Sequence, residues 1–292
     1  MATKGPTIRE FQERFPTEDS CLDHLMRVRF GERLTCFKCQ REARYYRVKA
    51  RRSFECEHCG YQVYPTAGTP FAKTRTSLRD WFYVMFLFCA SRNGVAAKEV
   101  QRQLGVTYKT AWRMCRLIRE YMGNVDGDHP LGGNGGGMVE ADKAFIGGKD
   151  RRGEDDKSVV LGMVERGGDV VTRVVRDRSG HSVIPHILKW VRKGSRISTD
   201  EAQAFGALLS RGYQHETVNH SAKEYVRGDT HTNTIEGFWA NVKRGISGTY
   251  VWVSKKHLQT YLREFEYRHN LRHAPYLMFE ALLRGFSQVR VG

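Results

Sequence analysis

Three acidic side chains in the C-terminal half of the sequence could carry metal-dependent chemistry. Asp142 follows the letters VEA, Asp200 ends the alternating segment SRISTD, and Glu236 lies within HTNTIEGFWANVKRG. Magnesium-dependent cleavage of phosphodiesters requires two or three carboxylates that converge at the ends of strands and helices. A single acid is more often a solvated surface group, but each of these three lies at an element end or in an apolar setting. Together they predict a metal-binding site.

Two neighbouring charges leave alternatives open around these acids. Glu140 lies two residues before Asp142, so both side chains are expected on the same strand face and compete for the same role. Lys243 follows Glu236 by seven residues, which returns to within about 20° of the same helix face, roughly 10 Å along the axis. An exposed pair at that spacing is worth only ~0 to 1 kcal/mol. A stabilising ion pair between Glu236 and Lys243 is therefore a weak explanation of this spacing. Trp239 is expected to pack in the core.

Two CxxC pairs predict a structural zinc site. Cys36 and Cys39 form the first pair, Cys56 and Cys59 form the second, and sixteen residues separate them. Four thiolates at this spacing can converge tetrahedrally on one zinc ion. The total of seven cysteines is odd, which favours metal ligation in a reducing compartment over a disulfide framework.

The charge of the chain points to a polyanionic partner. The 292 residues include 48 Lys and Arg against 32 Asp and Glu, a formal net charge of +16, with a pI near 9.7. Residues 1–122 carry 23 basic and 12 acidic side chains, so the attraction for nucleic acid is concentrated there. The sequence has no signal peptide and no long apolar stretch, which predicts a soluble cytoplasmic protein, associated with the nucleoid or nuclear in a eukaryote, without a membrane partner.

A helix-turn-helix pattern occupies residues 94–122. One helix, a short Leu-Gly-Val break and a second helix capped by Thr107 follow one another. The alternative is an ordinary helical pair with a solvated basic face. The second helix presents five side chains that could reach phosphates or guanine edges: Tyr108, Lys109, Arg113, Arg116 and Arg119.

The order of elements predicts an α/β protein built from several modules. Three strands beyond residue 138, then a helix, a strand, a helix over 201–212, a short strand and terminal helices favour a mixed sheet flanked by helices. We expect these segments: an N-terminal helical segment (1–30), a zinc ribbon (31–68), a helix-turn-helix domain (74–122), a Gly-rich linker (123–137) and a catalytic domain (138–292).

Several segments in combination resemble the transposases of the IS1595 insertion-sequence family, which have an N-terminal zinc ribbon and an ISXO2-like catalytic domain. They are CFKC with CEHC, TAGTPFAKTRTSLRDWF, LGVTYKTAWRM, VEADKAFIGGK and HTNTIEGFWANVKRGISGTY. The resemblance covers nearly the whole chain. It implies a DDE transposase whose catalytic domain has the RNase H-like fold.

The family pattern, transferred to this sequence, assigns catalytic roles to four residues. It makes Asp142, Asp200 and Glu236 the three acids and Lys243 the basic residue of the last helix. Thirty-five residues separate Asp200 from Glu236, similar to the spacing common among DDE enzymes. Some relatives are described with Asn as the third residue, so Asn233 stays open as a contributor.

The resemblance also implies cofactors and partners. The three acids would hold two Mg²⁺ ions, with Mn²⁺ as a substitute, and the cysteines would hold structural Zn²⁺. The partner would be double-stranded DNA, both terminal inverted repeats and target DNA, with Asn233 and Arg244 as further contacts. Because both ends of an element must be held together, a homodimer or larger homo-oligomer is expected.

Two rival functions remain at this point. A DNA-binding regulator derived from a transposase would bind repeats without magnesium-dependent strand breaks. A structure-selective nuclease would cut branched DNA and never join ends. A strand-transfer assay separates both from a transposase.

Overall fold

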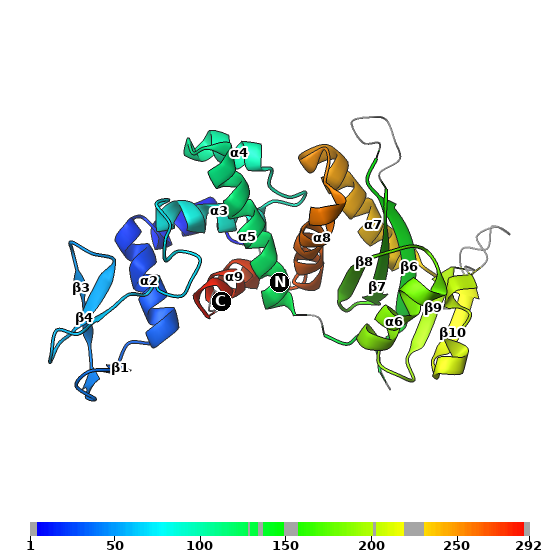
Figure 1. Cartoon of the computed structure of the whole chain (residues 1–292), viewed down its shortest axis with the longest axis horizontal. Helices are drawn as coiled ribbons and strands as arrows, with labels where there is room; N and C mark the ends of the chain where they lie inside the picture. Colours follow the sequence, from blue (N-terminus) through cyan, green and yellow to red (C-terminus); the bar gives the residue numbers. More distant parts are fainter. Residues whose placement is uncertain are drawn as a thin grey trace. The chain divides into compact units, whose positions relative to one another are not determined.

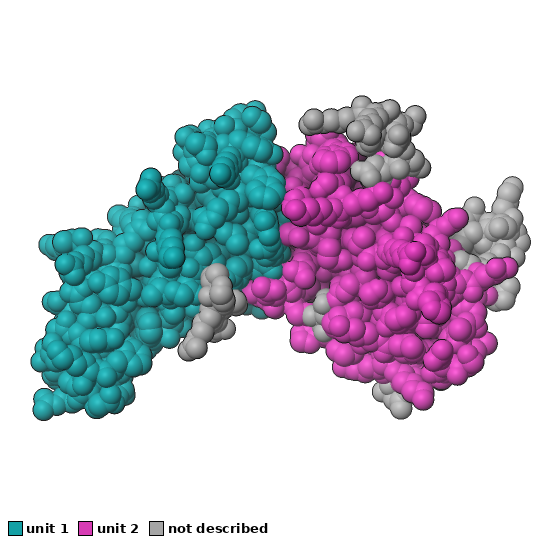
Figure 2. Space-filling view, viewed as in Figure 1, with its two compact units in different colours: residues 1–92, 97–121, 274–292 teal, residues 93–96, 122–273 magenta. Residues whose placement is uncertain are grey.

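The computed structural model describes residues 5–127, 129–133, 137–148, 157–200, 203–218 and 231–288. The chain divides into two compact units (Figure 2). Unit 1 comprises residues 1–92, 97–121 and 274–292, and unit 2 comprises residues 93–96 and 122–273. Residues 274–292 belong to unit 1, whereas the sequence predicts them as part of the catalytic domain.

Unit 1 combines a small β-rich ribbon with a set of helices (Figure 1). The ribbon has a two-stranded sheet, β1-β2, and a three-stranded antiparallel sheet, β3-β4-β5. The helices are α1 (Ile8–Arg14), α2 (Glu18–Phe30), α3 (Leu78–Ala90), α4 (Ala97–Leu104), the first part of α5 (Tyr108–Asp126) and α9 (Pro275–Gln288). The strands are β1 (Leu34–Thr35), β2 (Glu42–Ala43), β3 (Tyr45–Val48), β4 (Ser53–Cys56) and β5 (Gln62–Val63).

Local capping signals begin the helices of unit 1. Thr17 accepts a hydrogen bond from the Ser20 backbone nitrogen at the start of α2, and Ser77 does the same for Asp80 in α3. The Thr107 hydroxyl accepts from the Thr110 backbone nitrogen at the start of α5. Each cap satisfies a backbone N–H that the helix itself leaves unpaired.

Aromatic side chains fill the core of unit 1. The apolar segment at Trp81 forms the buried helix α3, which packs against α2 and α9. Phe286 of α9 stacks on Tyr121 of α5, with ring centroids 3.9 Å apart, and on Phe71, 5.5 Å away. The terminal helix therefore completes this aromatic core, which explains why it belongs to unit 1.

Unit 2 is built around a five-stranded mixed sheet in the order β10-β9-β6-β7-β8. Strands β6, β7 and β8 are antiparallel neighbours, while β9 runs parallel to both β6 and β10. The strands are β6 (Val139–Ile146), β7 (Ser158–Glu165), β8 (Val170–Val175), β9 (Arg196–Asp200) and β10 (Gln214–Val218). The helices are α6 (Gly180–Trp190), α7 (Asn233–Gly245) and α8 (Lys255–Asn270). The predicted mixed sheet with flanking helices is confirmed.

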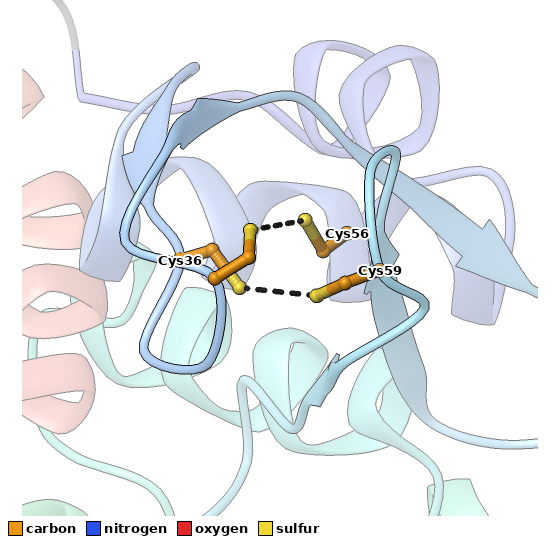
Figure 3. Close-up of side chains that lie close together, drawn as sticks. Cys36, Cys56 and Cys59 are labelled. Carbon is orange, nitrogen blue, oxygen red and sulfur yellow. Dashed lines mark hydrogen bonds between the residues drawn. The ribbon is translucent and has the colours of Figure 1, made fainter.

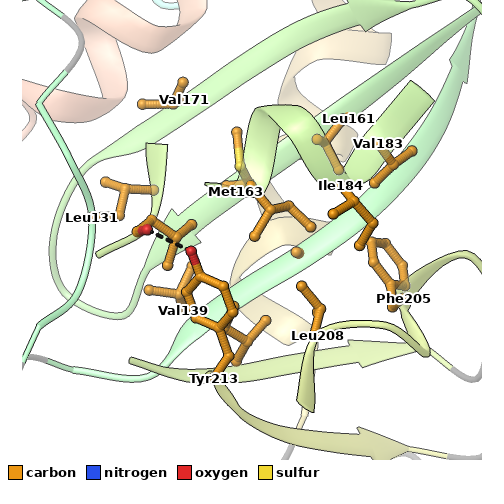
Figure 4. Close-up of a cluster of buried hydrophobic side chains, with 14 of the residues drawn as sticks. Leu131, Val139, Leu161, Met163, Val171, Val183, Ile184, Phe205, Leu208 and Tyr213 are labelled. Atoms are coloured by element: carbon orange, nitrogen blue, oxygen red, sulfur yellow. Dashed lines mark hydrogen bonds between the residues drawn. The ribbon is translucent and has the colours of Figure 1, made fainter. Parts of the chain in front are cut away.

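Alternation along the strands divides the core of unit 2 between the two sheet faces. One face carries Val139, Ala141 and Leu161 toward α6 and the segment around Phe205 (Figure 4). The other face carries Ala144 and Val160 toward α7 and α8. Successive strand residues point to opposite faces, so residue parity decides which helices each side chain meets.

Two segments differ from the sequence prediction. The helix expected over 201–212 is instead two short 3-10 turns, Gln203–Phe205 and Leu209–Arg211, within the described residues. This tighter path buries Phe205 and Leu208 against the sheet. In the expected linker, α5 continues to Asp126, and Leu131 is buried and bridged to Val191. Residues 128 and 134–136 of that linker lie outside the described residues.

In the part of the chain that the structure describes, every helix is too short or too polar to cross a membrane.

Candidate zinc centre and carboxylate site

The four cysteines of the two CxxC pairs converge in the ribbon of unit 1 (Figure 3). The sulfur atoms of Cys36 and Cys59 are 3.6 Å apart, and those of Cys39 and Cys56 are 3.9 Å apart. Four sulfurs at 2.3 Å from a tetrahedral zinc would be separated by about 3.8 Å. The cluster therefore has the dimensions of a four-thiolate zinc site.

Backbone groups support these sulfur atoms. The Lys38 backbone nitrogen lies 3.4 Å from the Cys36 sulfur, and the His58 nitrogen lies 3.4 Å from the Cys56 sulfur. These N–H groups donate toward thiolate charge and keep each CxxC turn in its ligand geometry. The side chain of His58 is turned toward Glu57 and the Glu42 carbonyl instead of joining the sulfurs.

Asp142 lies on the β6 face that meets α7. Its carboxylate oxygen Oδ2 accepts a hydrogen bond of 3.1 Å from the indole nitrogen of Trp239 in α7. Asp142 is paired across the sheet with Gly162 of β7. A side chain at residue 162 would begin 2.4 Å from the Trp239 ring and 2.8 Å from Ile235. Glycine at this position therefore lets α7 approach the sheet closely enough for Trp239 to reach Asp142.

Glu140 occupies the same strand face but has a different role. Its carboxylate is fully buried and accepts hydrogen bonds from the backbone nitrogens of Thr234 and Ile235, at 2.8 and 3.0 Å. Arg166 adds an ion pair at 2.7 Å. A carboxylate at the first turn of a helix satisfies unpaired N–H groups and favours the positive end of the helix dipole. Glu140 thus anchors the start of α7, and its oxygens are already occupied.

Asp200 lies beside Asp142 at the end of a parallel strand. The register pairs Ala141 with Thr199, and one further step along both strands brings Asp142 opposite Asp200, with neighbouring strands about 4.8 Å apart. Glu236 projects from the first turn of α7, where the Thr232 hydroxyl donates to it at 2.9 Å. The structure thus places Asp142 and Asp200 on one sheet face and Glu236 on the helix that covers this face, near enough for the charges of Asp200 and Glu236 to act on Asp142.

Burial and the neighbouring acids both change the pKa of Asp142. Burial, followed by the negative charges of Asp200 and Glu236, raises the pKa of Asp142 to about 6. Hydrogen bonds from the Lys143 backbone and Trp239 oppose this rise. Among the described residues, only the four cysteines form a tight group of three or more potential ligands. The acids are close enough to repel one another but do not converge as tightly.

The remaining predicted residues of α7 are exposed. Asn233 is the first residue of the helix, while Lys243 and Arg244 lie in its last turn. All three side chains face solvent. Asn233 is therefore at the same end of α7 as Glu236, and the two basic residues are at the opposite end.

The residues for which the sequence predicts a helix-turn-helix form α4 and α5. Tyr108, Lys109, Arg113 and Arg116 are exposed, as the sequence predicts for a DNA-facing helix. Arg119 is not part of this surface, because it is only 3% exposed and its guanidinium lies 5.0 Å from the centre of the Phe88 ring. The prediction for Arg119 is therefore wrong: the side chain lies on the core side of α5.

Three contributors to the carboxylate site were not recognised from the sequence. The sequence predicts only core packing for Trp239, indicates no role for Gly162 and does not distinguish Glu140 from Asp142. Only Gly162 carries a weak signal in the sequence, because a glycine within an apolar strand segment such as SVVLGMVER often marks the close approach of another element. The partner that approaches could not be named without the fold.

Comparison with known proteins assigns the family. Residues 134–270 match the ISXO2-like transposase domain of the IS1595 family, and residues 16–62 match the transposase zinc-ribbon domain of the same family. A zinc ribbon followed by a DDE-type transposase domain defines the class of protein. The chain belongs to the IS1595 family of transposases.

Two relatives agree with this assignment. A Halobacterium salinarum protein, described as an uncharacterized protein in transposable element ISH50, is 26% identical over 284 residues, covering 89% of this chain and 94% of its own length. A Haemophilus influenzae protein, described as an uncharacterized transposase-like protein, is 29% identical over 101 residues, covering 35% of this chain and 80% of its own.

Proposed function

We propose that the protein binds the terminal inverted repeats of an insertion sequence, cleaves the DNA at its ends and joins the freed ends to target DNA. The observation that carries this proposal is that Asp142 and Asp200 share one sheet face covered by the helix of Glu236, where burial and the charges of the other two acids raise the pKa of Asp142. Three carboxylates provide the hard oxygen donors that Mg²⁺ and Mn²⁺ prefer. The donor set therefore fits a pair of divalent cations.

The topology of unit 2 supports an RNase H-like catalytic domain. Three antiparallel strands are followed by two that extend the sheet in parallel from β6, so β6 lies at its centre. The first acid is on this central strand, the second ends the adjacent parallel strand, and the third is on α7. Ligands in α/β sheets commonly bind beyond the carboxyl ends of parallel strands.

Each acid has a distinct role in the proposed site. Asp142 interacts electrostatically with both other acids, and Asp142, Asp200 and Glu236 would together hold the cations. When bound, the cations would supply Lewis-acid activation of the attacking oxygen and stabilisation of the leaving 3′ oxygen. Trp239 holds Asp142 in one orientation, and Glu140 fixes the helix that presents Glu236. These two residues act by positioning the acids.

DNA binding is proposed to be divided between the units. The zinc ribbon and the exposed face of α5 would recognise the terminal repeats, since most of the excess positive charge lies in residues 1–122. In unit 2, Lys243 and Arg244 would contact the backbone beside the scissile bond. A homodimer or larger assembly would hold both ends of the element.

A strand-transfer assay tests this proposal against its rivals. The zinc-loaded protein is incubated with Mg²⁺, a duplex carrying one end of the element and a supercoiled target plasmid, and joined products are sequenced. Joined ends support a transposase. Binding without strand breaks would identify a regulator, and cleavage of branched DNA without joining would identify a structure-selective nuclease.

A Lys243→Ala variant tests the phosphate contact in the same assay. We expect slower cleavage and joining than with the matched surface variant Lys193→Ala, which changes an exposed lysine elsewhere on unit 2. Parental rates for Lys243→Ala would remove Lys243 from the proposed site.

A further inference from the structure

The chain makes an unusual turn directly after α7. Helix α7 passes into a π-helical turn over Ile246–Tyr250, and Val251 then adopts φ 63° and ψ −48°. The Trp252 backbone nitrogen donates to the Tyr250 carbonyl at 2.6 Å, so Val251 is the central residue of a γ-turn with positive φ. This form of γ-turn is rare and strained, most of all for a β-branched residue.

Contacts on both sides of the turn hold it in this conformation. The Tyr250 hydroxyl lies 2.7 Å from both carboxylate oxygens of the fully buried Glu264, and it accepts a hydrogen bond of 3.2 Å from the Val95 backbone nitrogen. A side chain at Gly94 would begin only 1.8 Å from that hydroxyl. On the other side, Val253 is buried in the core. The scaffold therefore imposes the strain, which is typical of functional segments.

The strained turn exposes two large apolar side chains. Val251 is 79% exposed and Trp252 is 52% exposed. We call this pair the 251–252 tip. Exposed basic residues lie on either side of it in the chain: Lys243, Arg244, Lys255 and Lys256. An apolar tip between basic side chains matches the chemistry of DNA, which offers base faces between charged phosphates.

We propose that the 251–252 tip is a binding site for an unstacked nucleobase, with the Trp252 indole stacked on the base. This rests on the proposed function, because it assumes that unit 2 engages DNA. Val251 and Trp252 follow Glu236 by fifteen and sixteen residues, beyond the far end of α7, or roughly 20 Å along the axis. That separation corresponds to about six base steps of a duplex. The site would therefore hold a base flanking the cleavage position, where bending or unpairing of the DNA end exposes it.

The test measures whether full-length, zinc-loaded protein prefers an unpaired base. The probes are two 30-base-pair duplexes of the same sequence, one fully paired and one with a single unpaired 5-iodouracil, in Ca²⁺ to prevent cleavage. Stacking on an aromatic side chain predicts that Trp252→Ala loses roughly 5- to 150-fold in affinity for the unpaired probe, and less than about twofold for the paired one. Trp252→Phe should retain most of the preference, and irradiation should cross-link the iodouracil to Trp252.

A matched variant separates base stacking from charge. Lys256→Ala is expected to weaken binding to both probes equally, because a phosphate contact carries no preference for an unpaired base. Since Trp252 is exposed, its replacement should leave the unfolding temperature unchanged, which a thermal melt verifies.

Other outcomes overturn the inference. Equal affinity of the parental protein for both probes, or an undiminished preference in Trp252→Ala, would refute the base site while leaving DNA binding and the proposed function intact. A change in oligomeric mass of Trp252→Ala without a change in preference would identify the tip as a contact between copies of the chain. Loss of binding to both probes by the parental protein would contradict the proposed function as well.

Discussion

The cysteine cluster of unit 1 and the carboxylate site of unit 2 are organised in opposite ways. The four sulfurs already have the spacing of a zinc site, with pairs 3.6 and 3.9 Å apart. Burial and the charges of Asp200 and Glu236 raise the pKa of Asp142, but the three acids are not as close together as the cysteines. The cysteine cluster has the geometry of a ligand set, whereas the three acids lie farther apart.

The origin of this difference is the source of the ligands. Each CxxC pair is local, and backbone N–H groups support its sulfurs, so two short turns complete the cluster. The acids come from two strands and a helix, and as like charges they repel one another. Divalent cations would convert that repulsion into attraction. The cysteine ligand set is therefore determined by two local turns, whereas the arrangement of the acids depends on the fold of unit 2 as a whole.

The largest effect is expected for Cys56→Ala. Loss of a zinc ligand removes binding energy on the order of 10 kcal/mol that is coupled to folding of a small zinc domain, so the ribbon should unfold. Metal analysis should show loss of zinc, and hydrogen exchange should become fast in residues 34–63. The sheet of unit 2 should keep its protection. Cys115→Ala, which alters a buried cysteine outside the cluster, should retain zinc, and loss of zinc there would contradict the assignment.

Glu140→Gln is expected to destabilise unit 2 by about 3 to 5 kcal/mol, because it leaves Arg166 and the start of α7 without their buried acid. Chemical denaturation measures the change. The control is Glu216→Gln on β10, whose acid forms an ion pair with Arg196 at the surface; it should change stability by less than about 0.5 kcal/mol. Equal effects of the two variants would show that Glu140 does not anchor α7.

We next predict that the stabilities of the two units depend on pH in opposite directions. In unit 1 the titrating group is His24. Burial, followed by the positive charge of Arg14, lowers the pKa of His24 to about 4. The unfolded state, with a histidine pKa near 6.5, therefore binds more protons between pH 6.5 and 4. The contribution of His24 to the free energy of unfolding of unit 1 should be fully present above pH 6.5 and should fall by up to about 3 kcal/mol toward pH 4.

Asp142 contributes a pH dependence of the opposite sign to the free energy of unfolding of unit 2. Its raised pKa means that the folded state holds the proton between pH 3.8 and about 6. This contribution is fully present below pH 3.8 and is lost as pH rises through about 6, by about 3 kcal/mol without metal. Hydrogen exchange in α2 and β6, measured as a function of pH, reports the stability of both units. His24→Gln should flatten the first slope and Asp142→Asn the second, and unchanged slopes would contradict the stated causes.

The sequence was sufficient for the features that depend on local pattern. The CxxC spacing predicted the cluster, and alternation predicted the strands of the mixed sheet. The sequence could not distinguish Glu140 from Asp142, because both lie on one strand face and only the position of α7 shows which acid caps the helix. Arg119 was misassigned for a related reason: a basic side chain on a periodic helix does not reveal that Phe88 covers it. The turn at Val251 could not be predicted either, because its conformation depends on the contacts of Tyr250 with Glu264 and Val95, which are distant in the sequence.

Metal-dependent strand cleavage by Glu236→Gln tests the central claim most directly. Glu236 is the acid supplied by α7, and the Glu216→Gln variant serves as its control on the same unit. With Mg²⁺ and a duplex carrying the element end, single-turnover cleavage should fall at least about a thousandfold for Glu236→Gln, since a metal ligand contributes several kcal/mol to the transition state. Zinc content and DNA affinity should stay at parental values. Cleavage by Glu236→Gln at the rate of the control would contradict the carboxylate site.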